Sequence, residues 1–150
     1  MSRVKYVMLI PDVDAPERVA VSFLPDGLWL VTDIPCYSSQ IGFLDTVRAS
    51  HDEKLGLVFE SVVQSSIWST YAIVLRDRDA TKTARALSDF ESFGCTYMMR
   101  STSGNGAYVS IAVPPSGLSD SINLLQEGHK AGLWLSGEVL VRDNKKAEAA

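Results

Sequence analysis

Two stretches of the C-terminal half follow the same strand-then-helix pattern. The first begins with a short apolar strand at Tyr71–Leu75 and continues as a helix that starts near Asp79. Aspartate is a favourable N-cap residue, and Gly94 ends the helix because glycine accepts the left-handed backbone of a C-terminal cap. A further apolar strand at Cys95–Met99 completes the unit.

The second stretch repeats this order. The polar segment Ser101–Gly106 predicts a turn, since Asn-Gly between two apolar runs is typical of a β-hairpin. A strand follows at Tyr108–Val113, and then a helix that ends at Gly128 or Gly132. The segment Leu133–Val141 predicts the last strand.

The two stretches also match in length. Tyr71 and Gly94 are 23 positions apart, and Tyr108 and Gly132 are 24 positions apart. Two units of this kind give the order β-α-β-β-α-β, which is the ferredoxin-like arrangement. In that arrangement both helices cover one face of a four-stranded antiparallel sheet.

The N-terminal part predicts strands first. Val4–Ile10 is short, apolar and rich in residues that favour β structure. Val19–Leu24 and Leu28–Thr32 are two apolar runs joined by Pro25-Asp26-Gly27. Proline sets one backbone angle of such a turn, aspartate bonds its own backbone, and glycine accepts a positive φ. A β-hairpin is therefore expected here.

Residues 39–65 predict a long helix. Apolar side chains recur at spacings of three, four and their multiples, at Ile41, Leu44, Val47, Leu55, Val58 and Val62. Interior glycines at positions 42 and 56 oppose this prediction, because each costs about 1 kcal/mol relative to alanine. A break near Ser50-His51-Asp52, giving two shorter helices, is the alternative.

The predicted fold class is therefore α+β, with an N-terminal hairpin and long helix packed with a ferredoxin-like sheet. We expect the hairpin and helix in residues 1–66, the ferredoxin-like unit in residues 67–143 and a frayed tail in residues 144–150. No segment rich in Pro, Gly or Ser separates the two parts. They are expected to pack together as one compact domain.

Charge and hydropathy exclude several classes of protein. The chain of 150 residues has a net charge of −4. Residues 1–75 carry five basic and nine acidic side chains, whereas residues 76–150 carry nine of each. This distribution lacks the basic surface that a duplex-DNA-binding protein needs. No apolar run approaches the ~18 residues of a membrane span, and none near the start resembles a signal peptide.

Cysteine and acidic residues give no framework for a disulfide-rich or metal-binding fold. The two cysteines, Cys36 and Cys95, are too few for either a disulfide scaffold or a Cys-rich zinc site. Asp12, Asp14 and Glu17 lack the spacing of a calcium loop, and prolines frame them as an ordinary turn. We expect no metal, no cofactor, two free thiols and a cytoplasmic location.

Two residues are candidates for catalysis. Cys36 precedes the predicted long helix, and a thiol near a helix N-terminus can have a lowered pKa. His51 has two carboxylates beside it in the sequence, but adjacent helical side chains do not face each other. A half-buried structural role is the simpler interpretation of both, so we expect that the protein is not an enzyme.

Six residues are candidates for binding. Arg76, Arg78 and Lys82 form part of a local basic group beside a helix N-terminus, where an anion can bind. Tyr71 and Tyr108 lie on the two predicted central strands, and Arg100 lies nearby. The strand order is shared with RNA-binding sheets whose aromatic side chains stack on bases, and Ala107, Tyr108 and Val109 fit the motif of such sheets.

The function expected from these observations is that of a binding or regulatory protein. It would act by forming a homo-oligomer or by docking on a protein partner, with a small-molecule ligand as a further option. Binding of single-stranded RNA or nucleotides on the sheet face is the first alternative. A small enzyme that uses Cys36 or His51 is the second.

Overall fold

The computed structural model describes residues 6–12, 16–76, 80–101 and 107–142. The chain divides into two compact units, Met1–Ser66 and Ile67–Ala150. The tail predicted for residues 144–150 and the Asn105-Gly106 turn lie outside the described residues.

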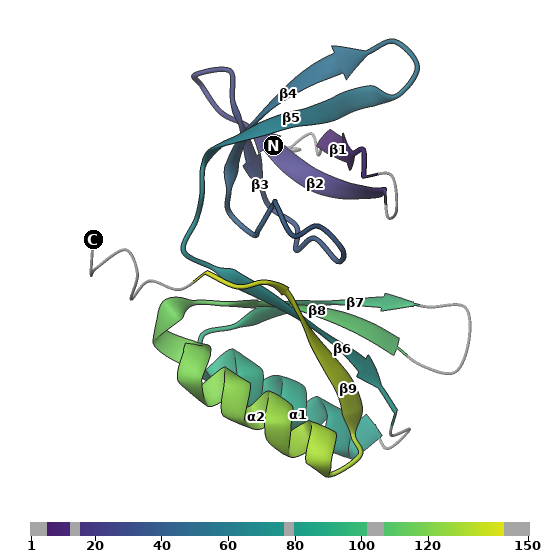
Figure 1. Ribbon diagram of the computed structural model, residues 1–150, viewed down its shortest axis with the longest axis vertical. Coiled ribbons are helices and arrows are strands. Elements are labelled where there is room, and N and C mark those ends of the chain that lie inside the picture. Colours follow the sequence, from purple (N-terminus) through teal and green to yellow (C-terminus); the bar gives the residue numbers. More distant parts are fainter. Residues whose placement is uncertain (1–5, 13–15, 77–79, 102–106, 143–150) are drawn as a thin grey trace, which may run out of the picture. The chain divides into compact units, whose positions relative to one another are not determined.

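The first unit is a closed barrel of five strands (Figure 1). The strands are β1 (Tyr6–Ile10), β2 (Glu17–Phe23), β3 (Trp29–Val31), β4 (Thr46–Asp52) and β5 (Gly56–Gln64). Consecutive strands pair antiparallel, and a parallel pair between β1 and β5 closes the barrel. Closure leaves no strand edge of this sheet unpaired.

Alternation of side chains along the strands builds the barrel core. Every second residue points inward. The buried residues of this core are Met8, Ile10, Val19, Val21, Val31, Ile41 and Val47. Most of them are β-branched, and such side chains pack well on a pleated sheet.

The hairpin predicted around Pro25-Asp26-Gly27 is confirmed. Strands β2 and β3 pair antiparallel, with Phe23 opposite Trp29. The Leu28 backbone N–H donates to Oδ1 of Asp26 at 3.1 Å, and Gly27 has a φ of +86°. Both roles of the turn residues are those expected from the sequence.

The long helix predicted for residues 39–65 is wrong. Most of this segment forms β4 and β5, and the two strands are joined by a tight turn. Oδ1 of Asp52 accepts the N–H groups of Lys54 and Leu55, which holds the pKa of this carboxyl below its usual value. Gly56 has a φ of +80°, a conformation that suits a turn and not a helix.

The predicted fold class is therefore wrong as well. The described residues form nine strands and two α-helices, and five of the strands close into a barrel. A hairpin with a long helix, packed on a ferredoxin-like sheet, does not describe this protein. The error arises because inward-facing residues of a strand recur at every second position. Some of them are therefore four or eight positions apart, and these spacings also occur on one face of a helix.

The second unit contains a four-stranded antiparallel sheet and two helices. Its elements are β6 (Ser69–Leu75), α1 (Ala80–Ser92), β7 (Thr96–Ser101), β8 (Ala107–Val113), a 3-10 turn (Pro115–Gly117), α2 (Leu118–Lys130) and β9 (Trp134–Leu140). The strand order is β7-β8-β6-β9. Both helices cover the same face of the sheet (Figure 1). The six strands and helices predicted in this part of the chain are present in the predicted order.

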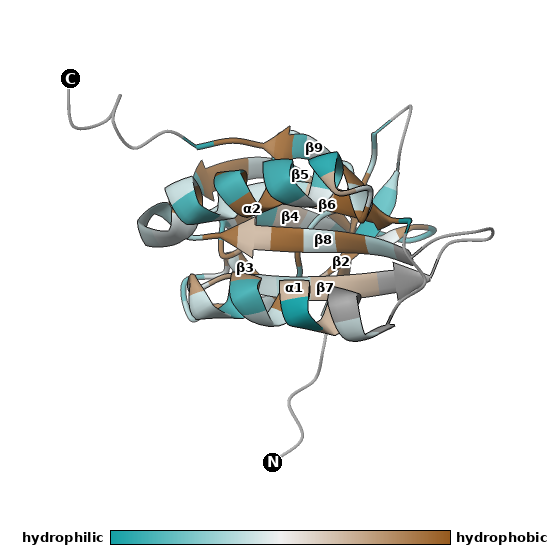
Figure 2. Ribbon diagram, turned by 90° about the horizontal axis from the view of Figure 1, so that it is seen from below, coloured by the Kyte–Doolittle hydropathy of each residue, from teal (hydrophilic) through white to brown (hydrophobic). Residues whose placement is uncertain are grey.

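The core of the second unit lies between this sheet and its helices. Alternate residues of β6 and β8 are buried beneath α1 and α2, among them Ile73, Val109 and Ile111. The outward face of α2 is hydrophilic and the strand β8 behind it is largely hydrophobic (Figure 2). Burial of this apolar surface stabilises the unit.

Trp134 anchors α2 to the start of β9. Its indole ring is 1% exposed, and Nε1–H donates to the backbone oxygen of Leu125 at 3.0 Å. The ring lies so close to α2 that a β-carbon on Gly128 would overlap it. Gly128 therefore serves close packing here and does not end the helix. The described helices include none that is long and apolar enough to cross a membrane.

Candidate functional site

Three aromatic side chains gather at one end of the barrel. The Trp29 ring makes edge-to-face contacts with Tyr6 and Phe23, with a centroid distance of 5.0 Å in each case. Tyr6 is 43% exposed and Phe23 is 58% exposed. We call Tyr6, Phe23 and Trp29 the aromatic cluster.

Strand alternation explains why the aromatic cluster forms. Tyr6 is in phase with the buried residues Met8 and Ile10, and Phe23 is in phase with Val21. Register places Tyr6 opposite Val21 and Phe23 opposite Trp29. The three rings thus extend the core to one end of the barrel, where Tyr6 and Phe23 remain exposed. Trp29 still packs against that core.

The sequence analysis did not identify the aromatic cluster. One signal was available, because the predicted hairpin already places Phe23 and Trp29 at mirrored positions around its turn. The proximity of Tyr6 depends on the pairing of β1 with β2, which local sequence does not specify.

A long loop between β3 and β4 is held by acidic side chains. The Glu17 carboxylate accepts three consecutive backbone N–H groups, those of Cys36, Tyr37 and Ser38, at 2.8 to 3.0 Å. These bonds engage one of the three acidic residues, Asp12, Asp14 and Glu17, that were weighed as metal ligands from the sequence. Within the described residues no group of three or more His, Cys, Asp or Glu side chains could hold a metal ion.

Asp45 fixes the other end of this loop. Its carboxylate is fully buried and accepts the N–H groups of Gly42 at 2.8 Å and Ser66 at 2.7 Å. A buried carboxylate is tolerated when backbone donors compensate for its lost hydration. The loop is therefore a fixed part of the barrel and not a loose connection.

The candidate catalytic residues lie on different elements, Cys36 in the loop after β3 and His51 on β4. Cys36 is 2% exposed, so its thiol has little access to a substrate. His51 lies on the exposed part of β4, and the predicted helix that would have placed Cys36 at an N-terminus is absent. Cys95 is also buried, and burial raises the pKa of its thiol. A raised pKa disfavours the thiolate that nucleophilic chemistry needs.

The candidate binding residues are not brought together. Tyr71 pairs with Ile111 and lies on the face that the helices cover, where it is 4% exposed. Tyr108 pairs with Val74, which is an odd number of positions from Tyr71 on β6 and so points to the other side of the sheet. Tyr108 therefore lies on the face opposite to Tyr71. The two rings cannot form a single stacking platform for bases.

Among the described side chains, the basic candidate residues do not form a cluster. Arg76 follows β6 and is exposed, and its backbone N–H donates to Leu133 O at 2.8 Å. Arg78 lies outside the described residues. The backbones of Lys82 on α1 and Arg100 on β7 are described, but their side chains are not. The anion site therefore stays a prediction.

Comparisons with known proteins give a fold relative and a family. A crystal structure titled as a novel structure of a hypothetical protein from Neisseria gonorrhoeae matches with a TM-score of 0.70. The two sequences are 21% identical over 95% of this chain and 99% of the other, so the likeness concerns the fold alone. A search of the curated proteins gives no match.

The profile of one protein family covers most of the chain. Residues 17–136 match the family described as "Domain of unknown function (DUF4265)". The match begins at β2 and ends within β9, so it includes parts of both units. The chain therefore belongs to the DUF4265 family.

Proposed function

We propose that this protein is a non-catalytic binding protein that docks on a protein partner through the aromatic cluster of its barrel. The observation that carries the proposal is the pair of exposed rings, Tyr6 and Phe23, held against Trp29. Exposed apolar groups that are fixed in place favour association. Aromatic residues are also enriched among the side chains that dominate binding energy at protein interfaces.

Charge supports a partner with basic character. Residues 1–66 carry five basic and nine acidic side chains. Asp26, in the turn between Phe23 and Trp29, is exposed beside the cluster. A second copy bound on the same face would bring these like charges together. A partner segment with an apolar centre and flanking Lys or Arg would instead be attracted and steered to this surface.

The proposed location is the cytoplasm. Both cysteines are buried and neither forms a disulfide in the described part of the chain, which suits a reducing compartment. The proposal includes neither a cofactor nor catalysis, and it assigns no role to duplex DNA or to a membrane.

The test is a selection from a random-peptide library displayed on phage, carried out against the full chain. Phe23→Ser is the variant, because it removes an exposed ring that contributes little to the core. Val63→Ser is the matched control, since Val63 is 47% exposed elsewhere on the barrel. We expect selected peptides with apolar centres and basic flanks that bind Phe23→Ser at least about tenfold more weakly.

The control variant should bind the selected peptides as tightly as the natural chain does. Peptides that bind Phe23→Ser equally well would show that the cluster is not the docking surface. Acidic flanks in the selected peptides would refute the charge argument. A dimer that Phe23→Ser dissociates would replace the protein partner with a second copy of this chain.

A further inference from the structure

The second unit has a groove between α2 and the edge strand β9 that is separate from the aromatic cluster. Its inner part is a cavity of about 190 Å³. An apolar cavity of about 150 Å³ can hold a benzene molecule, so this one can hold a single aliphatic side chain. Its apolar walls are Tyr71, Ile122 and Leu125, and its polar rim is Gln126, Ser136 and Glu138.

The groove continues toward the end of α2. A second hollow of about 280 Å³ is lined by Gln126, His129, Lys130 and Ser136. It shares Gln126 and Ser136 with the inner cavity, so the two hollows lie next to each other along α2 and β9. We call the two together the α2–β9 groove.

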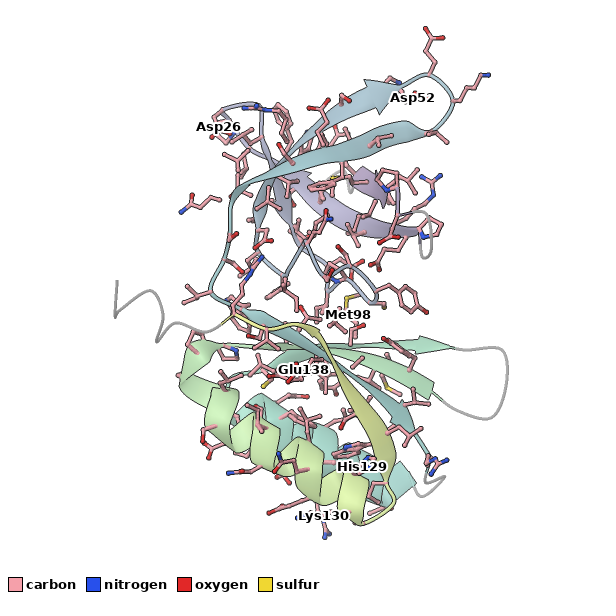
Figure 3. The ribbon with its side chains drawn as sticks, in the orientation of Figure 1. Asp26, Asp52, Met98, His129, Lys130 and Glu138 are labelled. Carbon is pink, nitrogen blue, oxygen red and sulfur yellow. The ribbon has the colours of Figure 1, made fainter. Side chains whose placement is uncertain are left out.

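The α2–β9 groove has opposite charges at its two ends. Glu138 lies on β9 at the inner end, and His129 and Lys130 lie at the C-terminal end of α2 (Figure 3). All three side chains are exposed. The N–H groups of residues 131–133 already bond backbone carbonyls of the last turn of α2. These N–H groups offset the partial negative charge that the last carbonyls of a helix carry. The positive charge of Lys130 is therefore the main charge at that end of the groove.

Tyr71 adds a hydrogen-bonding group to the inner end. Its ring is almost completely buried, yet the side chain lines the cavity beside Glu138. Burial, and secondly the charge of Glu138, raise the pKa of the Tyr71 phenol. The phenol therefore keeps its proton at neutral pH and can donate it to a bound group. No hydrogen-bond partner of this hydroxyl occurs among the described residues.

The length of the groove along its two walls limits the size of a ligand. Ile122 beside Glu138 and Lys130 at the far end are eight residues apart on α2, which corresponds to about 12 Å. Ser136 and Glu138 are two residues apart on β9, or about 7 Å. The ammonium nitrogen and carboxylate carbon of a free amino acid are only about 2.5 Å apart. A peptide of two or three extended residues, at about 3.5 Å per residue, is about 7 to 10 Å long and therefore matches the length of the groove.

Strand β9 can also hold an extended ligand by its backbone. It is at the edge of the sheet order β7-β8-β6-β9, and in the described part of the chain it pairs with β6 alone. Its outer N–H and C=O groups are therefore available to an added strand. A ligand with its ammonium at Glu138 and its carboxylate at Lys130 would run antiparallel to β9, which is a favourable pairing direction.

We infer that the α2–β9 groove binds a zwitterionic peptide of two or three residues with a central or terminal aliphatic side chain. Glu138 holds its ammonium group, Lys130 and His129 hold its carboxylate, and β9 pairs with its backbone. The aliphatic side chain enters the cavity between Ile122 and Leu125. This inference does not depend on the docking proposed for the barrel.

The test is a titration of the full chain with the tripeptide Ala-Leu-Ala, followed by NMR chemical shifts of backbone amides. We expect saturable shifts at Gln126, Ser136 and Gly137. The N-acetylated and the C-amidated forms should each bind about two- to fivefold more weakly, as expected for loss of one solvent-exposed charge pair. Free leucine should bind more weakly than either.

The Glu138→Gln variant tests whether the ammonium end of the peptide lies at Glu138. In this variant N-acetylation should no longer weaken binding, whereas C-amidation should weaken it as before. Glu127→Gln is the matched control, since Glu127 is an exposed carboxylate of α2 that does not line the groove. That variant should respond to both caps as the natural chain does.

Several results would overturn the inference. They are no shift at millimolar Ala-Leu-Ala, shifts confined to residues outside the groove, equal binding of the doubly capped peptide, and equal binding of free leucine. The comparison of capped and uncapped peptides on the natural chain needs no variant. It therefore decides the question even if Glu138→Gln fails to fold.

Discussion

Gly128→Ala tests the packing of Trp134 against α2. Alanine is favoured over glycine in a helix by about 1 kcal/mol, so an isolated helix would gain stability from this change. In the protein the new methyl group would overlap the indole of Trp134. The ring would have to move away from Leu125 O, to which its Nε1–H donates at 3.0 Å.

The costs outweigh the gain in helix propensity. Overpacking of a filled core costs about 1–3 kcal/mol, and loss of the indole hydrogen bond costs about 1 kcal/mol. After subtraction of the helical gain, the free energy of unfolding should fall by about 1–3 kcal/mol. In urea this corresponds to a midpoint lowered by on the order of 1 M.

The assay is a urea titration followed by the Trp134 indole N–H signal in NMR, which reports on the second unit directly. Gly137→Ala is the control, because a β-carbon at Gly137 meets nothing within 4 Å. That change should leave the stability unchanged or raise it by up to about 1 kcal/mol. A Gly128→Ala variant as stable as Gly137→Ala would refute the packing argument. Trp134→Phe should make Gly128→Ala less costly than it is beside tryptophan.

Three more predictions concern Asp45, Glu17 and Cys95. Asp45→Ala leaves two backbone N–H groups without their acceptor. The free energy of unfolding, measured by urea titration, should therefore fall by about 2–5 kcal/mol. An unchanged midpoint would contradict this role of Asp45. Glu17→Ala should speed amide hydrogen exchange at residues 36–38, and equal rates would show that the carboxylate does not hold the loop. Burial raises the pKa of Cys95, so the folded chain keeps a proton that the unfolded chain loses above about pH 8.5. Stability should therefore decline as pH rises above that value, and Cys95→Ala should flatten the decline.

The second unit could be predicted from local patterns because its elements carry their own signals. Helix α1 ends at Ser92, and Gly94, whose φ is +88°, follows two residues later in the turn that the glycine predicted. The strands around Ile73 and Ile111 are short apolar runs, and helices separate the strands of each predicted unit. Each element was recognisable without knowledge of its neighbours.

The barrel could not be predicted in the same way. Its closing pair joins Met8 to Leu57 and Leu9 to Val58, almost fifty residues apart in the sequence. No local pattern specifies such a pairing, and the spacing of Val47, Val58 and Val62 favoured a helix. The pleat of β6 and β8 likewise puts Tyr71 and Tyr108 on opposite faces, although both lie on central strands.

The parallel pair of β1 and β5 is the seam of the barrel. Only two residue pairs form it, whereas seven pairs join β4 to β5. Closing a loop of about fifty residues costs roughly 3–4 kcal/mol of chain entropy, and the short seam returns little of this. Strand β1 forms five residue pairs with β2 and two with β5, so we expect β1 to separate from β5 before it separates from β2. Tyr6 stands at the start of β1, so opening the seam would also remove one ring from the aromatic cluster. A partner bound there as we propose would therefore stabilise the closed barrel.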